Sequence, residues 1–183
     1  MDIQELRNGI RLTIQQIDAN LPAEGATIGA DAAALVESRI VERGERTDGA
    51  KFSAYSTKPV PAFLYFGRSR NSGGEARVRK AAKDGEGVAY ADFRRFNGLG
   101  TGEKNFQFTG EMWQGFGVRS VRVIQQGVIE IEIGGKNARS NLLLKAHSER
   151  EKSELTQNSP RELEMVTAGL SDRILTIIKR NMT

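Results

Sequence analysis

The sequence predicts an α+β fold, in which a small antiparallel sheet is packed by long N- and C-terminal helices and a basic segment extends from the domain. Two patterns support this fold class. Apolar residues recur every three or four positions near both ends of the chain, as in amphipathic helices, and alternate with polar residues between positions 121 and 133, as in strands. The 183 residues, 38% of them hydrophobic, suffice for a single domain, 1–183, with its own core.

The first helix is expected to end at Pro22, because proline has no amide hydrogen to continue the helical hydrogen bonding. The apolar stripe of this helix consists of Ile3, Leu6, Ile10, Ile14, Ile17 and Leu21. Such a stripe needs a partner that covers it. A second helix is expected to follow the cap residue Asp31 and to end at Gly44, and Thr47–Gly49 then predicts a turn.

A strongly basic segment follows, in which six cations accompany one acid, Glu75. The cations are Arg68, Arg70, Arg77, Arg79, Lys80 and Lys83. Because the segment lacks hydrophobic periodicity and contains Gly73–Gly74, we expect a mobile arm or long loop, inserted into the domain at about 57–87. Its cations are candidates for contact with nucleic acid or with an acidic neighbouring subunit, and a solvated loop is the alternative.

The stretch "NGLGTGEKN", 97–105, is the part of the chain most similar to a nucleotide-binding loop. It departs from the P-loop pattern, because Glu103 separates Gly102 from Lys104 and Asn105 occupies the position of the Ser or Thr. The preceding residues, Val88–Phe96, predict a short helix with core aromatic residues rather than the required strand. We therefore expect a flexible connector and no phosphate site.

An antiparallel hairpin is predicted beyond this connector. Its alternating apolar residues are Val121, Val123, Ile129, Ile131 and Ile133. The two strands are separated by a tight turn at 125–127. Glu130 and Glu132 fall on the opposite, wetter face, where Arg119 and Arg122 of the partner strand are candidates for ion pairs.

Two helices are expected after the hairpin. The first includes "NARSNLLLKAHSEREKSEL" and ends before Gln157. Ser159–Glu162 forms a capping box that begins the second, with Pro160 at its first position. This C-terminal helix carries an apolar stripe at Leu163, Val166, Leu170, Ile174 and Ile177. At 1.5 Å per residue its length is roughly 31 Å, enough to cross the sheet.

The composition argues against an enzyme. The chain has no cysteine and a single histidine, His147, which excludes disulfides and thiolate sites and disfavours zinc. The sequence contains no recognisable set of nucleophile, base and orienting group, so we expect no catalytic residues, cofactor or metal. We also expect no membrane span, since no apolar run approaches ~20 residues, and synthesis in the cytoplasm, since the N-terminus is charged.

The order of these parts resembles the tail-completion and head-to-tail joining proteins of tailed bacteriophages, also catalogued as virion morphogenesis or minor tail proteins. The resemblance covers roughly residues 40–179, and its most specific piece is "NFQFTGEM", 105–112. The residues of this motif, with the tryptophan that follows, are Phe106, Phe108, Thr109, Gly110, Met112 and Trp113. We expect them in the core, with Trp113 beneath the C-terminal helix.

The resemblance implies an α+β fold and a structural role without catalytic residues. Family members form closed rings, expected here to be hexamers or dodecamers, at the neck or the head-proximal end of the tail. Such a ring would contact portal or adaptor proteins on one side and tail proteins on the other, with genomic DNA passing through it. The expected location is therefore the virion neck or tail. A basic nucleic-acid-binding protein that uses the segment 68–83 is the alternative.

Overall fold

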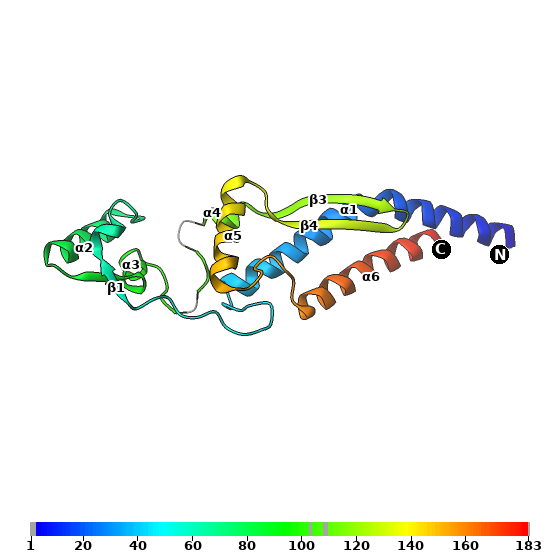
Figure 1. The fold of residues 1–183 in the computed structure, drawn as a ribbon. Helices are drawn as coiled ribbons and strands as arrows, with labels where there is room; N and C mark the ends of the chain where they lie inside the picture. The colour runs from blue at the N-terminus through cyan, green and yellow to red at the C-terminus, as the bar shows by residue number, and fades with distance from the viewer. Residues whose placement is uncertain (1–2, 103, 108–109, 183) are drawn as a thin grey trace. The chain divides into compact units, whose positions relative to one another are not determined.

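The structure, a computed structural model, describes residues 3–102, 104–107 and 110–182, and it confirms the α+β class (Figure 1). The chain divides into two compact units. We call residues 1–38 and 111–183 the hairpin unit and residues 39–110 the inserted unit. The insertion expected at about 57–87 lies inside this second unit.

The helix α1 (Ile3–Val41) continues through the position at which we expected it to end, so the two predicted N-terminal helices are one. Pro22 lies inside it. A proline in a helix interior costs about 3 kcal/mol through one lost hydrogen bond and a steric clash. Leu21 and Ile28, on either side of the proline, are buried, and their burial favours a continuous helix strongly enough to offset that cost.

The predicted hairpin is confirmed as the antiparallel strands β3 (Phe116–Gln125) and β4 (Val128–Gly135). Val121 lies opposite Ile131, and Gly127 in the turn has a φ of 73°. The expected ion pairs also form on the polar face. They join Arg119 to Glu132, with 2.7 Å between the nitrogen and oxygen atoms, and Arg122 to Glu130, with 3.9 Å.

The hairpin packs against α1 where two glycines allow a close approach. A Cβ atom at Gly25 would lie 2.8 Å from both Cγ1 of Val121 and Cδ1 of Ile129. Gly29 lies one helical turn later. A Cβ atom there would lie 2.7 Å from Cγ2 of Ile131 and 2.8 Å from Cγ2 of Val118. A larger residue at either glycine would therefore push the hairpin away from the helix.

The short helix α4 (Glu111–Gln114) packs against α5 (Ala138–Glu151). The buried Ser140 joins them, because its hydroxyl donates a hydrogen bond of 2.7 Å to the carbonyl of Met112. Trp113 is buried and contacts the ring of Phe116 edge-on, with 5.5 Å between centroids. We expected α4 to pack beneath the C-terminal helix, and α5 is instead the helix that it packs against.

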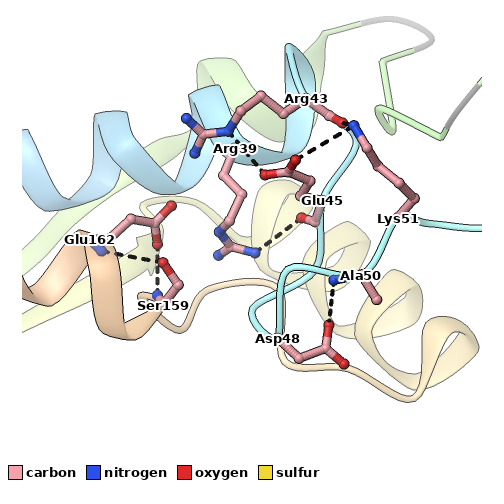
Figure 2. A network of polar contacts seen from close by, with 8 residues as sticks. All are labelled: Arg39, Arg43, Glu45, Asp48, Ala50, Lys51, Ser159 and Glu162. Atoms are coloured by element: carbon pink, nitrogen blue, oxygen red, sulfur yellow. Dashed lines mark hydrogen bonds and ion pairs between the residues drawn. The ribbon is translucent and has the colours of Figure 1, made fainter.

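The C-terminal helix α6 (Pro160–Met182) begins with the predicted capping box. The amide of Ser159 donates to the Glu162 carboxylate at 2.7 Å, and the amide of Glu162 donates to the Ser159 hydroxyl at 3.3 Å (Figure 2). Arg173 pairs with Glu24 and Asp31 of α1, at 3.2 and 3.8 Å, so α6 lies along α1. The predicted stripe of α6 is only half-buried at Val166, Leu170, Ile174 and Ile177.

In the inserted unit, the end of α1 is tied to the loop that follows it (Figure 2). Arg39 donates to the carbonyl of Glu45 at 3.2 Å, and the Glu45 carboxylate pairs with Arg43 at 3.2 Å and with Lys51 at 3.6 Å. The predicted turn at 47–49 is present, and the amide of Ala50 donates to the Asp48 carboxylate at 3.0 Å.

The rest of the inserted unit is a small mixed core. The strands β1 (Pro59–Pro61) and β2 (Gly87–Ala89) pair antiparallel, followed respectively by the 3-10 helix η1 (Ala62–Tyr65) and the helix α3 (Tyr90–Phe96). The helix expected from Val88 therefore begins at Tyr90, because the first residues of that segment pair with β1. The core of the inserted unit includes Ala62, Val78, Ala81, Val88 and Phe93.

The prediction of a mobile basic arm is wrong, because residues 72–83 form the helix α2 (Ser72–Lys83). The side chain of Asn71 caps it, accepting a hydrogen bond of 2.7 Å from the amide of Gly74. The buried face of α2 consists of Gly74, Val78 and Ala81, at helical spacing. Two of these three residues are so small that the sequence shows no apolar stripe.

The packing at Gly29 predicts opposite effects for two identical substitutions in α1. Gly29→Ala should lower the free energy of unfolding by about 1 to 3 kcal/mol, because the new methyl group would overlap stiff β-branched side chains. Gly9→Ala should raise it by roughly 0.5 to 1 kcal/mol, since a Cβ atom there meets nothing within 4 Å and alanine favours helix. Urea denaturation measures both values, and changes of the same sign would contradict the proposed packing.

Candidate interaction surfaces

The glycine-rich stretch 97–105 lies beside a buried arginine on α3. Arg94 is 1% exposed. Its guanidinium donates to the carbonyls of Gly100 and Gln107, both at 2.8 Å, and to the side-chain oxygen of Asn105 at 3.2 Å. These contacts orient backbone oxygens toward a cation, whereas a phosphate loop presents amide hydrogens to an anion. The expected flexible connector is thus tethered at Gly100 and Asn105, and the chain that follows it at Gln107.

Tyr55 completes the surroundings of Arg94. The guanidinium carbon lies 4.0 Å from the centre of the Tyr55 ring. The Tyr55 hydroxyl donates to the Asn105 side chain at 3.0 Å and accepts from the Asn105 amide at 3.1 Å. Burial raises the pKa of Tyr55, although the hydrogen bond from Asn105 and the charge of Arg94 act to lower it. The cluster is a structural tether.

The described residues of the "NFQFTGEM" motif turn the chain and lead into the buried core of the hairpin unit. Phe106, expected in a strand, has a left-handed φ of 55°. The Asn105 side chain accepts a hydrogen bond from the Gln107 amide across this turn. The Phe106 ring packs edge-on against Phe52. Gly110 has a φ of 83°. Two buried residues of the hairpin unit, Met112 and Trp113, follow. The predicted positions Phe108 and Thr109 lie outside the described residues.

The six predicted cations form a surface of the inserted unit, which we call the cationic surface. Arg68 and Arg70 precede α2, and Arg77, Arg79, Lys80 and Lys83 occupy its exposed side. All six are exposed. In the described part of the chain only Arg79 is in an ion pair, with Glu75 at 2.8 Å.

Exposed apolar side chains lie close to this surface. Phe63, Leu64 and Phe66 are exposed, and Phe63 is 62% exposed. The guanidinium of Arg79 lies 4.8 Å from the centre of the Phe66 ring, which joins the apolar and cationic groups. These neighbours were not predicted from the sequence. The run "FLYF" at 63–66 was a visible signal, but its exposure depends on η1 turning one aromatic residue, Tyr65, toward the core.

In the hairpin unit, the first turns of α1 carry large apolar side chains that remain exposed in the described chain, although Thr13 on the same side is buried. The hairpin turn contacts α1 at Asp18, which accepts a hydrogen bond of 2.8 Å from Gln126. Figure 1 shows α1 extending past the hairpin tip. The exposed residues of this segment are Ile3, Leu6, Ile10, Leu12 and Ile14. We call the four that share the predicted stripe, Ile3, Leu6, Ile10 and Ile14, the uncovered face of α1.

A groove lies between α1 and α6 in the same unit, with a volume of about 450 Å³. Its lining is mainly apolar, from Ile28, Ala34 and Leu35 of α1 and Val166 of α6. Small residues, including Gly169, widen it. The groove and the uncovered face lie on different parts of α1.

Charge is divided unequally between the two units. The inserted unit contains 14 Lys and Arg residues against 8 Asp and Glu, a net charge of +6. The hairpin unit contains 13 against 15, a net charge of −2. The basic character of the chain therefore belongs to the unit that carries the cationic surface.

Other kinds of site find no support in the described ranges. Residues 3–102, 104–107 and 110–182 contain no group of three or more His, Cys, Asp or Glu side chains that could hold a metal ion. Among these residues, no helix combines the length and the apolar character needed to cross a bilayer. Comparison with protein-family models, curated proteins and solved structures finds no match to this chain. The cationic surface, the uncovered face of α1 and the groove are the features on which a function can be proposed.

Because Arg94 is buried and Arg95 is exposed, replacing each by methionine should change the free energy of unfolding by very different amounts. Arg94→Met should destabilise the protein by about 3 kcal/mol or more, because it removes charged hydrogen bonds and leaves buried carbonyls without a donor. Arg95→Met should change the free energy of unfolding by less than about 1 kcal/mol, since Arg95 is exposed and its ion pair with Asp92 is a surface pair. Urea denaturation gives both values, and similar losses would show that Arg94 is not the organising residue.

Proposed function

We propose that the protein is a structural subunit of a tailed-phage virion that assembles into a ring at the neck or the head-proximal end of the tail. The ring would join head and tail and line the path by which DNA leaves the capsid. Two independent observations support this proposal. The order of sequence motifs resembles tail-completion proteins, and the uncovered face of α1 is the surface that an assembling subunit needs.

The uncovered face is the observation that carries the proposal. Ile3 is 80% exposed, and Leu6, Ile10 and Ile14 are each at least 40% exposed along three successive turns of one helix. Covering such a face with another protein stabilises the assembly by about 25 cal/mol for each Å² of apolar surface removed from water. A row of large apolar residues on one helix is typical of an interaction site rather than of ordinary surface variation.

The same unit offers a second apolar surface that can receive this face. The groove between α1 and α6 is lined mainly by apolar residues, including Ile28, Leu35 and Val166, so it can accept apolar side chains of this face. Since the two surfaces lie at different places on one subunit, a contact between them is heterologous, or head-to-tail. Heterologous contacts generate a ring when the rotation between subunits closes.

The experiment is a measurement of the oligomer by light scattering and negative-stain electron microscopy. The natural protein should form a closed ring with a central opening. Ile10→Asp combined with Ile14→Asp should give a folded monomer, because both side chains are already exposed within the subunit. The control, Asn8→Asp with Gln15→Asp, adds the same charge on the opposite side of the same helical turns and should still assemble.

Circular dichroism on each variant separates loss of assembly from loss of folding. A natural protein that stays monomeric at every concentration would contradict the proposal. Equal assembly of the Ile10/Ile14 variant and the control would show that the uncovered face is not the interface.

A further inference from the structure

The exposed side of α2 is chemically uniform. Every long side chain on it is cationic, from Arg77, Arg79, Lys80 and Lys83. Ala76, also exposed on α2, is small and adds no bulk beside these cations. With 12 residues, α2 presents this charge over roughly 18 Å.

The loop before α2 is held in place, so its two arginines have defined positions. The amide of Arg70 donates to the side-chain oxygen of Asn97 at 2.6 Å. The amide of Gly67 donates to both oxygens of the Glu75 carboxylate, at 3.2 and 3.1 Å. Because the loop is anchored at both ends, Arg68 and Arg70 extend the cationic surface without the entropy loss of ordering a mobile segment.

This surface is not neutralised by the unit that carries it. Glu75, the acid of α2, accepts hydrogen bonds from the Gly67 amide and pairs with Arg79. The other five cations make no ion pair with any described residue. An unbalanced cluster of this kind attracts a polyanion over a distance of about one Debye length.

The exposed rings beside the cations narrow the class of polyanion. Arginine binds phosphate through its planar fork of donors, and aromatic faces stack on nucleic-acid bases. The rings of Phe63 and Phe66 are exposed, and the guanidinium of Arg79 lies over one side of the Phe66 ring. An anionic peptide would use the cations but would leave these rings without a specific partner.

We propose that the cationic surface binds nucleic acid, with Arg and Lys on the phosphodiester backbone and Phe63 and Phe66 against exposed bases. The binding surface belongs to the inserted unit, whereas the ring contact proposed above uses the hairpin unit. The two proposals are therefore independent, and either can fail while the other holds.

The test measures binding of labelled DNA to the full chain by fluorescence anisotropy, with ~30-nucleotide single strands and duplexes of the same sequence. Affinity should fall steeply between roughly 50 and 200 mM salt, because bound cations release counterions from DNA. The variant Arg77→Gln/Lys80→Gln/Lys83→Gln should bind at least about tenfold more weakly and lower the slope of log affinity against log salt by about 2 to 3.

The control variant, Lys145→Gln/Arg150→Gln/Arg161→Gln, removes the same charge from exposed positions of the hairpin unit and should bind like the natural protein. Phe63→Ser/Phe66→Ser should weaken binding to single strands more than to duplexes. Equal loss of affinity in the two triple variants would overturn the proposal, because net charge alone would then explain binding. The proposal also fails if no DNA binds, or if polyglutamate or anionic vesicles bind more tightly than either DNA.

Discussion

The hairpin unit depends on the close approach of strands to a helix at Gly25 and Gly29. The side chains that fill the space above these glycines are β-branched, so they have few alternative rotamers and fix the distance and register of the hairpin on α1. The length of the hairpin then decides how much of the helix is covered. Its turn at Gly127 lies where Gln126 meets Asp18, and beyond this contact the large apolar residues of the α1 stripe remain exposed in the described chain.

A different constraint organises the inserted unit, where the charge of Arg94 is balanced by dipoles. The guanidinium is buried, and its contacts within the described residues are carbonyl oxygens and the ring of Tyr55. Such a group is expensive to desolvate, and it tolerates burial only when its donors are satisfied. The loop must therefore supply oxygens at set positions, and a glycine-rich sequence can adopt the backbone angles that this requires.

Features encoded by neighbouring residues were predictable from the sequence. The hairpin follows from alternation around one turn, and the capping box needs only Ser159 and Glu162. The errors arose where distant contacts decide the outcome. Helix α1 continues through Pro22 because tertiary packing outweighs a local penalty, and Phe106 is left-handed where Asn105 is bound by Tyr55, 50 residues away in the chain.

The cationic surface and the uncovered face of α1 were also only partly predictable from the sequence. The six cations were evident from composition, but the helix that displays them was not, since its buried face includes a glycine and an alanine. The apolar residues of α1 were also evident, whereas their exposure depends on where the hairpin ends. Sequence patterns identify the apolar and charged residues that need a partner, and the fold determines which of them are buried or paired within the folded chain.

The proline in α1 has a mechanical consequence. Pro22 cannot donate the hydrogen bond that the carbonyl of Asp18 would receive in a regular helix, and Asp18 is also the residue that the hairpin turn contacts. The helix therefore lacks one backbone hydrogen bond in the turn where the hairpin meets it. Residues 3–17 precede this turn, and the helix beyond Pro22 is held by the hairpin and by α6. We therefore expect α1 to bend most readily near Pro22, which would change the direction of its N-terminal turns relative to the rest of the helix.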